Sequence, residues 1–155
     1  MLQRKVTKRL VKWKNESSKA LLVTGARQIG KSYVIREFGK SNYFCYFEVN
    51  LLLDKAAKST LASAESAVDF INRIALLSDA PLVEGDTLIF VDEIQEHPDI
   101  VTLMKALVED GRYSFVFSGS MLGTEFKGIS SFPVGYVEQI VMRPMDFEEF
   151  CWAVG

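Results

Sequence analysis

The amino-acid sequence alternates between two kinds of apolar pattern. Short unbroken apolar runs are typical of strands buried in a sheet, whereas apolar residues spaced three and four apart are typical of one helix face. The runs predict strands at residues 20–24, 43–47, 87–91, 113–117 and 137–141. The stripes predict helices at residues 2–13, 31–38, 70–77 and 98–110, with a last helix after Asp146. This alternation predicts an α/β fold, a five-stranded parallel sheet with helices on both faces in three layers.

Local signals refine several of these boundaries. Gly39 is the expected stop of the second helix, because glycine readily ends helices. The unbroken aromatic run at 43–47 predicts a strand buried on both faces. Pro98 suits the first position of a helix. Asp146 lies three residues before Glu149, a spacing that caps a helix N-terminus.

The most informative stretch is the loop after the first strand. Gly25 and the triplet Gly-Lys-Ser at 30–32 fit G-x-x-x-x-G-K-[ST], the Walker A motif or P-loop. Its glycines let backbone N–H groups turn inward toward an anion, and the following helix adds its unpaired N–H groups and positive end. Lys31 is predicted to reach the β- and γ-phosphates of a nucleotide, and the Ser32 hydroxyl to bind Mg²⁺. We expect the Lys31 side chain to face solvent in the empty loop. The predicted phosphate-site residues are Gly25, Ala26, Arg27, Gln28, Ile29, Gly30, Lys31, Ser32 and Tyr33.

A second stretch delivers two carboxylates at the end of an apolar strand. Asp92 and Glu93 directly follow residues 87–91. The carboxyl ends of parallel strands are where open α/β sheets bind ligands. Asp92 is predicted to hold the Mg²⁺ that Ser32 also contacts, which is the Walker B role. Glu93 is predicted to be catalytic, as the general base for a water that attacks the γ-phosphate.

Other candidates follow other strands. Ser120, with Ser118 as second choice, leaves the fourth strand, where a hydroxyl can hydrogen-bond the γ-phosphate or the water. Glu48 and Asn50 end the second strand and could position a metal or a water, although a solvated loop is the simpler interpretation. His97 is the only histidine, and it has no visible catalytic partner, so we interpret it as a loop residue.

Composition is that of one globular domain spanning residues 1–155, with 48% hydrophobic and 25% charged residues and a net charge of −2. No apolar run reaches the roughly 18 residues of a membrane span, and no signal-peptide pattern follows the basic start. Cys45 lies in an apolar run and is expected in the core, while Cys151 is far away and in no metal-like spacing. These features predict a cytoplasmic protein in a reducing compartment.

Charge is unevenly distributed along the chain. Residues 1–19 hold seven Lys or Arg and one Glu. Such a block is typically a solvated helix face, and a contact with nucleic acid is the alternative.

Four stretches together resemble a bacterial and archaeal group of AAA-type P-loop ATPases, whose ATPase core is usually followed by a C-terminal domain of unknown function. They are Gly-Ala-Arg-Gln-Ile-Gly-Lys-Ser at 25–32, Phe-Val-Asp-Glu-Ile-Gln at 90–95, Phe-Ser-Gly-Ser at 117–120 and Arg-Pro-Met-Asp-Phe-Glu-Glu-Phe at 143–150. The resemblance implies the additional-strand class of ATPase fold, in which the Walker A and Walker B strands flank the strand that ends at Ser120. It also implies ATP and Mg²⁺ as ligands, and it implies no defined cellular substrate.

Two features depart from that group. In many members a basic residue follows the glycine that matches Gly135, whereas this chain has Tyr136. Members also continue past the position matching Gly155, so we expect the chain to be the ATPase core from the N-terminal part of a longer protein, with the lid domain absent. The candidates for a charge-stabilising arginine in cis are Arg27, Arg112 and Arg143.

Three functions fit these residues. The first is a Mg²⁺-dependent ATPase that works as a switch or motor core through partner domains, with a homo-oligomer as one way to complete the site. The second is a small-molecule or nucleotide kinase. The Asp92–Glu93 pair argues against a kinase, because it suits the activation of a water. The third is an ATP-binding module without turnover that grips nucleic acid through residues 1–19.

Overall fold

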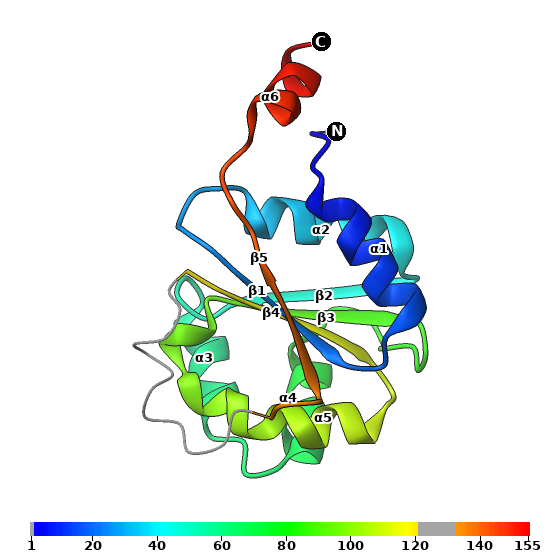
Figure 1. Ribbon diagram of the computed structural model, residues 1–155. Coiled ribbons are helices and arrows are strands. Elements are labelled where there is room, and N and C mark those ends of the chain that lie inside the picture. Colours follow the sequence, from blue (N-terminus) through cyan, green and yellow to red (C-terminus); the bar gives the residue numbers. More distant parts are fainter. Residues whose placement is uncertain (1, 121–132) are drawn as a thin grey trace.

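The computed structural model describes residues 2–120 and 133–155, and these form a three-layer α/β fold around a five-stranded parallel sheet (Figure 1). The strands are β1 (Ala20–Thr24), β2 (Cys45–Asn50), β3 (Thr87–Asp92), β4 (Ser114–Gly119) and β5 (Val137–Val141), in the order β2-β3-β4-β1-β5. The helices are α1 (Val6–Glu16), α2 (Lys31–Asn42), α3 (Lys55–Ala62), α4 (Ala67–Leu77), α5 (Met104–Asp110) and α6 (Phe147–Val154), with 3₁₀ helices η1 (Ile94–Glu96) and η2 (Pro98–Leu103). The predicted fold class is confirmed.

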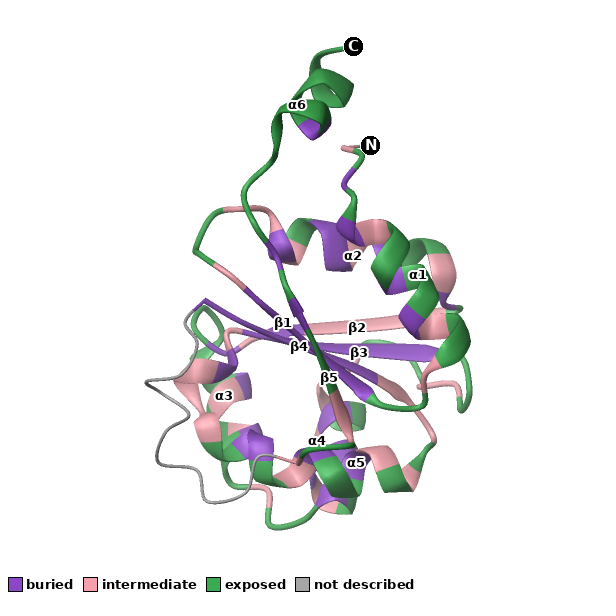
Figure 2. Ribbon diagram, viewed as in Figure 1, coloured by how far each residue is buried: buried purple, intermediate pink, exposed green. Residues whose placement is uncertain are grey.

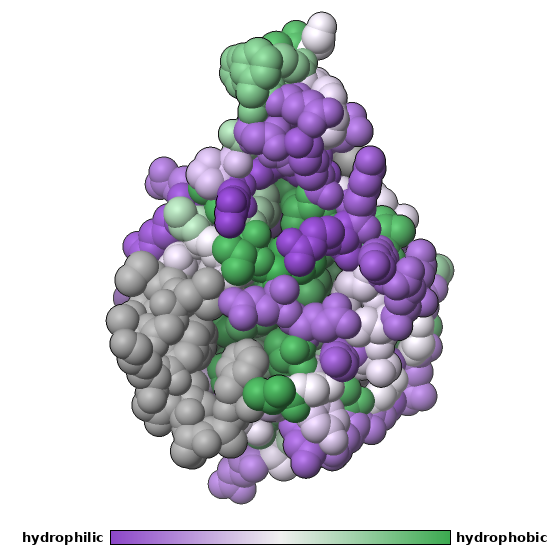
Figure 3. Space-filling model, in the orientation of Figure 1, coloured by the Kyte–Doolittle hydropathy of each residue, from purple (hydrophilic) through white to green (hydrophobic). Residues whose placement is uncertain are grey.

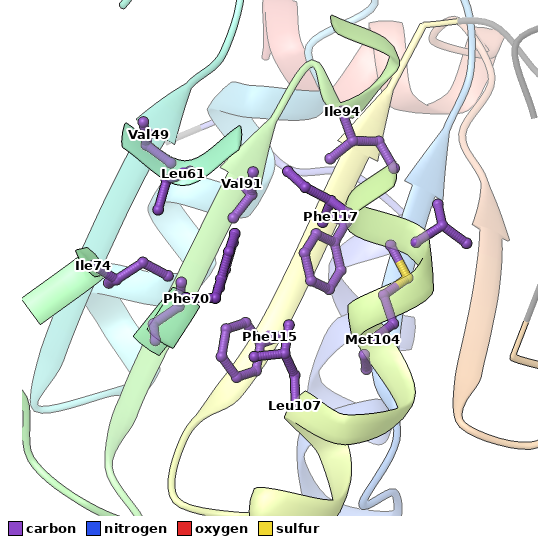
Figure 4. Packing of buried hydrophobic residues seen from close by; sticks show 14 of the residues in the cluster. Val49, Leu61, Phe70, Ile74, Val91, Ile94, Met104, Leu107, Phe115 and Phe117 are labelled. Carbon is purple, nitrogen blue, oxygen red and sulfur yellow. The ribbon is translucent and has the colours of Figure 1, made fainter. Parts of the chain in front are cut away.

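Each face of the sheet builds its own core. In β1, Leu21 and Val23 pack with α1 and α2 on one face, whereas Ala20 and Leu22 pack with α3, α4 and α5 on the other. Successive strand residues point to opposite faces, so one apolar run serves both cores. Figure 4 shows the core on the face covered by α3, α4 and α5, where aromatic rings such as Phe70 lie among aliphatic side chains from strands and helices.

The strand order decides where the chemistry lies. β4 lies between β1, which leads into the P-loop, and β3, which ends in Asp92. This is the additional-strand arrangement that the resemblance implies. Because all three strands are parallel, the P-loop, Asp92 and Ser120 meet at one edge of the sheet.

The C-terminal segment leaves the compact body. In Figure 1, α6 stands at the top of the view, near the N-terminus and away from the two helix layers. Most of α6 is exposed in Figure 2, and Glu149 is its buried residue. Figure 3 shows apolar side chains at the top of the molecule, over α6, whose exposed large hydrophobics include Phe147, Phe150 and Trp152.

The structure differs from the predictions in where the second helix ends and in how deeply the second strand is buried. α2 continues through Gly39 to Asn42. A Cβ on Gly39 would lie 2.4 Å from the Tyr46 ring, so this glycine permits close approach of α2 to the sheet instead of ending the helix. β2 is an edge strand, and its residues are mostly half-buried.

The strand predicted at residues 43–47 begins at Cys45 and runs to Asn50. Phe44, placed in that strand by its aromatic neighbours, is 81% exposed. Cys45 is half-buried and not a core residue. Residues 123–133 contain no strand or helix pattern and predict a loop, and apart from Pro133 they lie outside the described residues.

Candidate functional site

The side chain of Lys31 folds back onto the backbone of the P-loop. α2 begins at Lys31, directly after Gly30 in the left-handed conformation (φ 91°). The Lys31 ammonium donates hydrogen bonds to the carbonyl oxygens of Gly25 (2.9 Å) and Ala26 (2.6 Å). Lys31 is only 7% exposed, so the expectation that it faces solvent is wrong. Burial lowers its pKa below the ordinary value of 10.5, since desolvation disfavours the charged form.

Gly25 is required by a close backbone contact. A Cβ built on Gly25 would lie 2.3 Å from the carbonyl oxygen of Met142, in the segment that follows β5, and Gly25 has a φ of 149°. The N–H of Met142 donates to the Thr24 carbonyl at 2.7 Å, which extends the pairing of β5 with β1. The first glycine of the P-loop therefore also permits the segment after β5 to pass this close to the loop.

Asp92 is the centre of a compact cluster of hydrogen bonds. It is 2% exposed at the end of β3. The Ser32 hydroxyl donates to its Oδ2 at 2.5 Å, and the Ser118 hydroxyl donates to its Oδ1. The Glu93 N–H donates to Oδ1 at 2.9 Å, and the Asn50 amide reaches Oδ2 at 3.4 Å. The cluster thus joins the P-loop helix to three strands, β2, β3 and β4.

This cluster fits a magnesium ion chemically. All the side chains that contact Asp92 are neutral, and within the described residues no cationic side chain forms an ion pair with it. A buried carboxylate beside a hydroxyl offers the hard oxygen ligands that Mg²⁺ prefers, and Mg²⁺ commonly binds one or two such side chains together with substrate phosphates. The described residues hold no cluster of three or more His, Cys, Asp or Glu suited to an all-protein metal cage. Ser32 and Asp92 are therefore the residues that would hold the ion.

Strained backbone conformations occur where the chain leaves the carboxyl ends of β1 and β3. Among the described residues, the non-glycine residues with positive φ are Gln28, in the P-loop (63°), and Glu93, after β3 (60°). Such conformations are uncommon for residues with a Cβ, and they cluster at functional sites. The chain therefore accepts strained backbone at the positions of the predicted phosphate loop and general base.

Ser120 connects both sides of the site. Its hydroxyl accepts hydrogen bonds from Arg27 Nε (3.4 Å) and from Gln95 Nε2 (3.2 Å). The same Gln95 amide donates to the Glu93 carboxylate. Sequence reasoning did not assign a role to Gln95, although the Phe-Val-Asp-Glu-Ile-Gln stretch that contains it was one signal of the resemblance.

Comparison with known families agrees with this geometry. Residues 17–151 match the AAA domain family, which is most of the chain. The chain belongs to the AAA domain family. A comparison with curated proteins gave no match.

A solved structure shows the same fold. The AAA domain superposes on the Walker-type ATPase PABY2304 of Pyrococcus abyssi with a TM-score of 0.62 and 14% sequence identity. The match covers 96% of this chain and 55% of the Pyrococcus chain. At this identity the likeness concerns the fold. The family match supports ATP binding and hydrolysis at a general level.

Several sequence candidates lie elsewhere in the AAA domain. Arg112 precedes β4, at the amino edge of the sheet, and its guanidinium pairs with Asp110. Arg112 is therefore at the opposite edge of the sheet from the P-loop and cannot be the charge-stabilising arginine in cis. Arg27, in contrast, lies at the site, where it contacts Ser120. Glu48 forms an ion pair with Arg36 at 2.7 Å, so that carboxylate is already engaged. His97 links the two 3₁₀ helices, as a loop residue would.

The basic N-terminal block is partly engaged within the domain. Arg4 is buried and pairs with Glu149, Lys5 contacts Asp146, and Lys14 lies over the Tyr43 ring. Lys8, Arg9 and Lys12 lie on the exposed part of α1. No helix of the described residues has the length and apolar character needed to cross a bilayer.

Proposed function

We propose that this AAA domain binds ATP with Mg²⁺ at the P-loop edge of its sheet and hydrolyses it, with Glu93 as the general base. The observation that carries the proposal is the 2.5 Å hydrogen bond from the Ser32 hydroxyl to Asp92. It brings the hydroxyl of the P-loop motif and the carboxylate of the third strand to one point, which is the pair that a nucleotide-bound Mg²⁺ requires.

Phosphate binding would use groups that are already in place. The loop from Gly25 to Gly30 and the first turn of α2 would supply backbone N–H groups, and Lys31 would turn its ammonium from the Gly25 and Ala26 carbonyls to the β- and γ-phosphates. A phosphate would restore charge compensation to an ammonium whose pKa is lowered by burial. When bound, Mg²⁺ would neutralise charge that develops on the phosphate oxygens.

Water activation would fall to Glu93. It follows Asp92 directly, so its carboxylate lies beside the residue that would hold the metal, and it is on the P-loop edge of the sheet. A carboxylate there can take a proton from a water as that water attacks the γ-phosphate. Ser120 and Arg27, which contact each other at 3.4 Å, are the side chains we assign to the γ-phosphate. Tyr33 follows Ser32 in α2 and is partly exposed at the rim of the loop.

The proposal includes action through other parts of a larger assembly. The matched Pyrococcus ATPase is almost twice as long as the region it shares with this domain. α6 carries exposed apolar side chains on a segment that leaves the body. Both observations support a switch or motor core that passes on its nucleotide state through a C-terminal domain or a second copy.

The decisive experiment compares Glu93→Gln with Asp92→Asn. Glu93→Gln keeps the size of the side chain and removes the base, so single-turnover ATP hydrolysis should fall about 10²- to 10⁴-fold while ATP·Mg²⁺ affinity is retained. Asp92→Asn should first weaken the Mg²⁺-dependent part of ATP binding. Hydrolysis is followed as phosphate release without an added acceptor, which also separates an ATPase from a kinase. Wild-type hydrolysis by Glu93→Gln would contradict the assignment.

A further inference from the structure

The amide of Gln95 contacts both the proposed base and the end of the neighbouring strand. Gln95 lies in η1, directly after the strained Glu93. Its Nε2 donates to Glu93 Oε2 and to Ser120 Oγ, the latter at 3.2 Å. Its Oε1 accepts the Ser120 N–H at 3.4 Å. One side chain therefore ties the carboxylate after β3 to the hydroxyl and the N–H of the residue after β4.

The orientation of this amide is dictated by its surroundings. A carboxylate can only accept, so the nitrogen of Gln95 must face Glu93, and a backbone N–H can only donate, so the oxygen must face Ser120 N. Turning the amide over would place two acceptors together and two donors together. The network is therefore consistent in only one direction, and it fixes one oxygen of the Glu93 carboxylate.

The Gln95 amide lies close to Gly119. A Cβ built on Gly119 would lie 3.1 Å from Gln95 Oε1, tighter than ordinary van der Waals contact. Gly119 is the last residue of β4, and its φ is not among the positive values. The absence of a side chain at Gly119, and not an unusual backbone conformation, therefore lets the amide lie this close to β4.

We propose that Gln95 is a positioning residue that holds the Glu93 carboxylate for water activation, using Ser120 as its anchor. This inference rests on the proposed role of Glu93 as the base. A glutamate has three rotatable side-chain bonds, and a general base must lie within hydrogen-bond reach of the water it activates. Gln95 holds Glu93 Oε2 and leaves Oε1 for the water. Because Ser120 also accepts from Arg27, the network runs from the P-loop to the base without interruption.

The test measures single-turnover hydrolysis and equilibrium ATP·Mg²⁺ binding for Gln95→Ala. A displaced base should lower the hydrolysis rate about 10- to 100-fold, because small misplacements of catalytic groups carry penalties of that size. ATP affinity should stay within about 2-fold of the wild type, since Gln95 is not assigned to the phosphates. Gln3→Ala, an exposed glutamine near the N-terminus, is the matched control and should hydrolyse at the wild-type rate.

A double-mutant cycle with Glu93→Gln separates positioning from a general structural effect. If Gln95 acts through the Glu93 carboxylate, Gln95→Ala should add little to the loss already caused by Glu93→Gln, so the two losses should not multiply. Multiplying losses would overturn the positioning role, and so would a wild-type rate in Gln95→Ala. A wild-type rate in Glu93→Gln would instead overturn the proposed function, so the two failures are distinguishable.

Gly119→Ala provides a second variant that leaves the Gln95 amide intact. Its methyl group should push Gln95 Oε1 away and reduce hydrolysis in the same direction but by less, with unchanged ATP binding. In a Gln95→Ala background the methyl group has no amide to displace, so Gly119→Ala should then have no further effect on the rate. A loss that persists in that background would contradict the proposed role of the Gly119–Gln95 contact.

Discussion

Two buried carboxylates, Asp92 and Glu149, each join segments that are far apart in the sequence, but their partners differ. Asp92 is 2% exposed, and the side chains of Ser32, Ser118 and Asn50 that surround it are all neutral. Glu149 is 5% exposed and pairs with the Arg4 guanidinium at 3.2 Å. The first carboxylate is left able to receive a cation, while the second already has one.

The Arg4–Glu149 pair is a completed structural contact. Glu149 also accepts the N–H groups of Lys5 (2.7 Å) and Asp146 (3.1 Å). Arg4 donates in addition to the carbonyls of Ile29 (2.9 Å) and Arg143 (2.8 Å). One guanidinium thereby connects the N-terminal segment, the back of the P-loop and the chain leading to α6, and its hydrogen-bonding capacity is largely used within the fold.

The P-loop is held by both centres at once. Ser32, at its end, donates to Asp92, and the Ile29 carbonyl, within it, accepts from Arg4. The difference in partners predicts that substitutions around Asp92 reduce ATP binding or hydrolysis but barely change the stability of the fold. Substitutions around Arg4 should reduce stability but barely change ATP binding.

The largest effect is expected from Lys31→Ala on the Asp92 side. We expect ATP·Mg²⁺ affinity to fall by at least about 100-fold, because the variant loses the ammonium that we assign to the β- and γ-phosphates. The stability of the fold should not fall by a comparable amount. Burial lowers the pKa of Lys31, which means that the folded empty chain disfavours its charge. Calorimetry gives the affinity and thermal unfolding gives the stability; unchanged affinity would refute the phosphate-loop assignment.

The Arg4 side should respond with the opposite pattern. Arg4→Ala leaves a buried carboxylate without its cation, a change that typically costs about 3–5 kcal/mol where the carboxylate stays buried. Because α6 lies outside the main body, we expect this loss locally, as faster hydrogen exchange in residues 2–9 and 145–155. ATP affinity should change by less than about 10-fold.

Lys5→Ala is the matched control for Arg4→Ala. Lys5 also makes ion pairs with this segment, to Asp146 and Glu148, both at 2.7 Å, but all three side chains are about half exposed or more. Exposed pairs of this kind contribute little. Hydrogen exchange in the control should therefore resemble that of the wild type. Equal protection in Arg4→Ala and the wild type would show that the buried pair does not hold α6.

The two centres also differ in how far sequence reasoning could reach. The P-loop, Asp92 and Glu93 were predicted because each lies in a contiguous motif whose spacing reflects local backbone geometry. The Arg4–Glu149 contact joins residues 145 positions apart, and no local pattern announces it. The N-terminal basic stripe was interpreted as a solvated face, and Arg4 is the residue for which that interpretation is wrong.

Other differences have the same origin. Gly39 looked like a helix stop because glycine often ends helices, but here the space beside Tyr46 determines its place. The aromatic run of β2 suggested a central strand, yet strand order is a property of the whole sheet and puts β2 at the edge. The role of Gln95 depends on the neighbouring strand β4, so it too required the folded chain.

The smallest effect is a pH dependence confined to the Glu149 side. Burial alone would raise the pKa of Glu149, but the N–H groups of Lys5 and Asp146, together with Arg4, outweigh it and hold the pKa below the ordinary 4.5. A carboxyl group whose pKa is lowered by folding contributes stability that is fully present above about pH 4.5 and is lost as the pH falls through its folded pKa.

The α6 segment should therefore loosen in acid before the main body unfolds. Trp152 of α6 reports this event, because its ring lies 5.9 Å from the Lys5 ammonium. We expect its fluorescence to change as the pH falls below about 4.5, with Trp152→Phe used to subtract the signal of the buried Trp13. Asp146 adds to the acid response, because its hydrogen bond with Lys5 holds the pKa of that carboxyl below its usual range as well. Glu149→Gln should remove the Glu149 contribution and leave that of Asp146, so the acid transition should become shallower. An identical transition in Glu149→Gln and the wild type would mean that Asp146 alone accounts for the acid response, and that Glu149 does not supply the pH-dependent hold on α6.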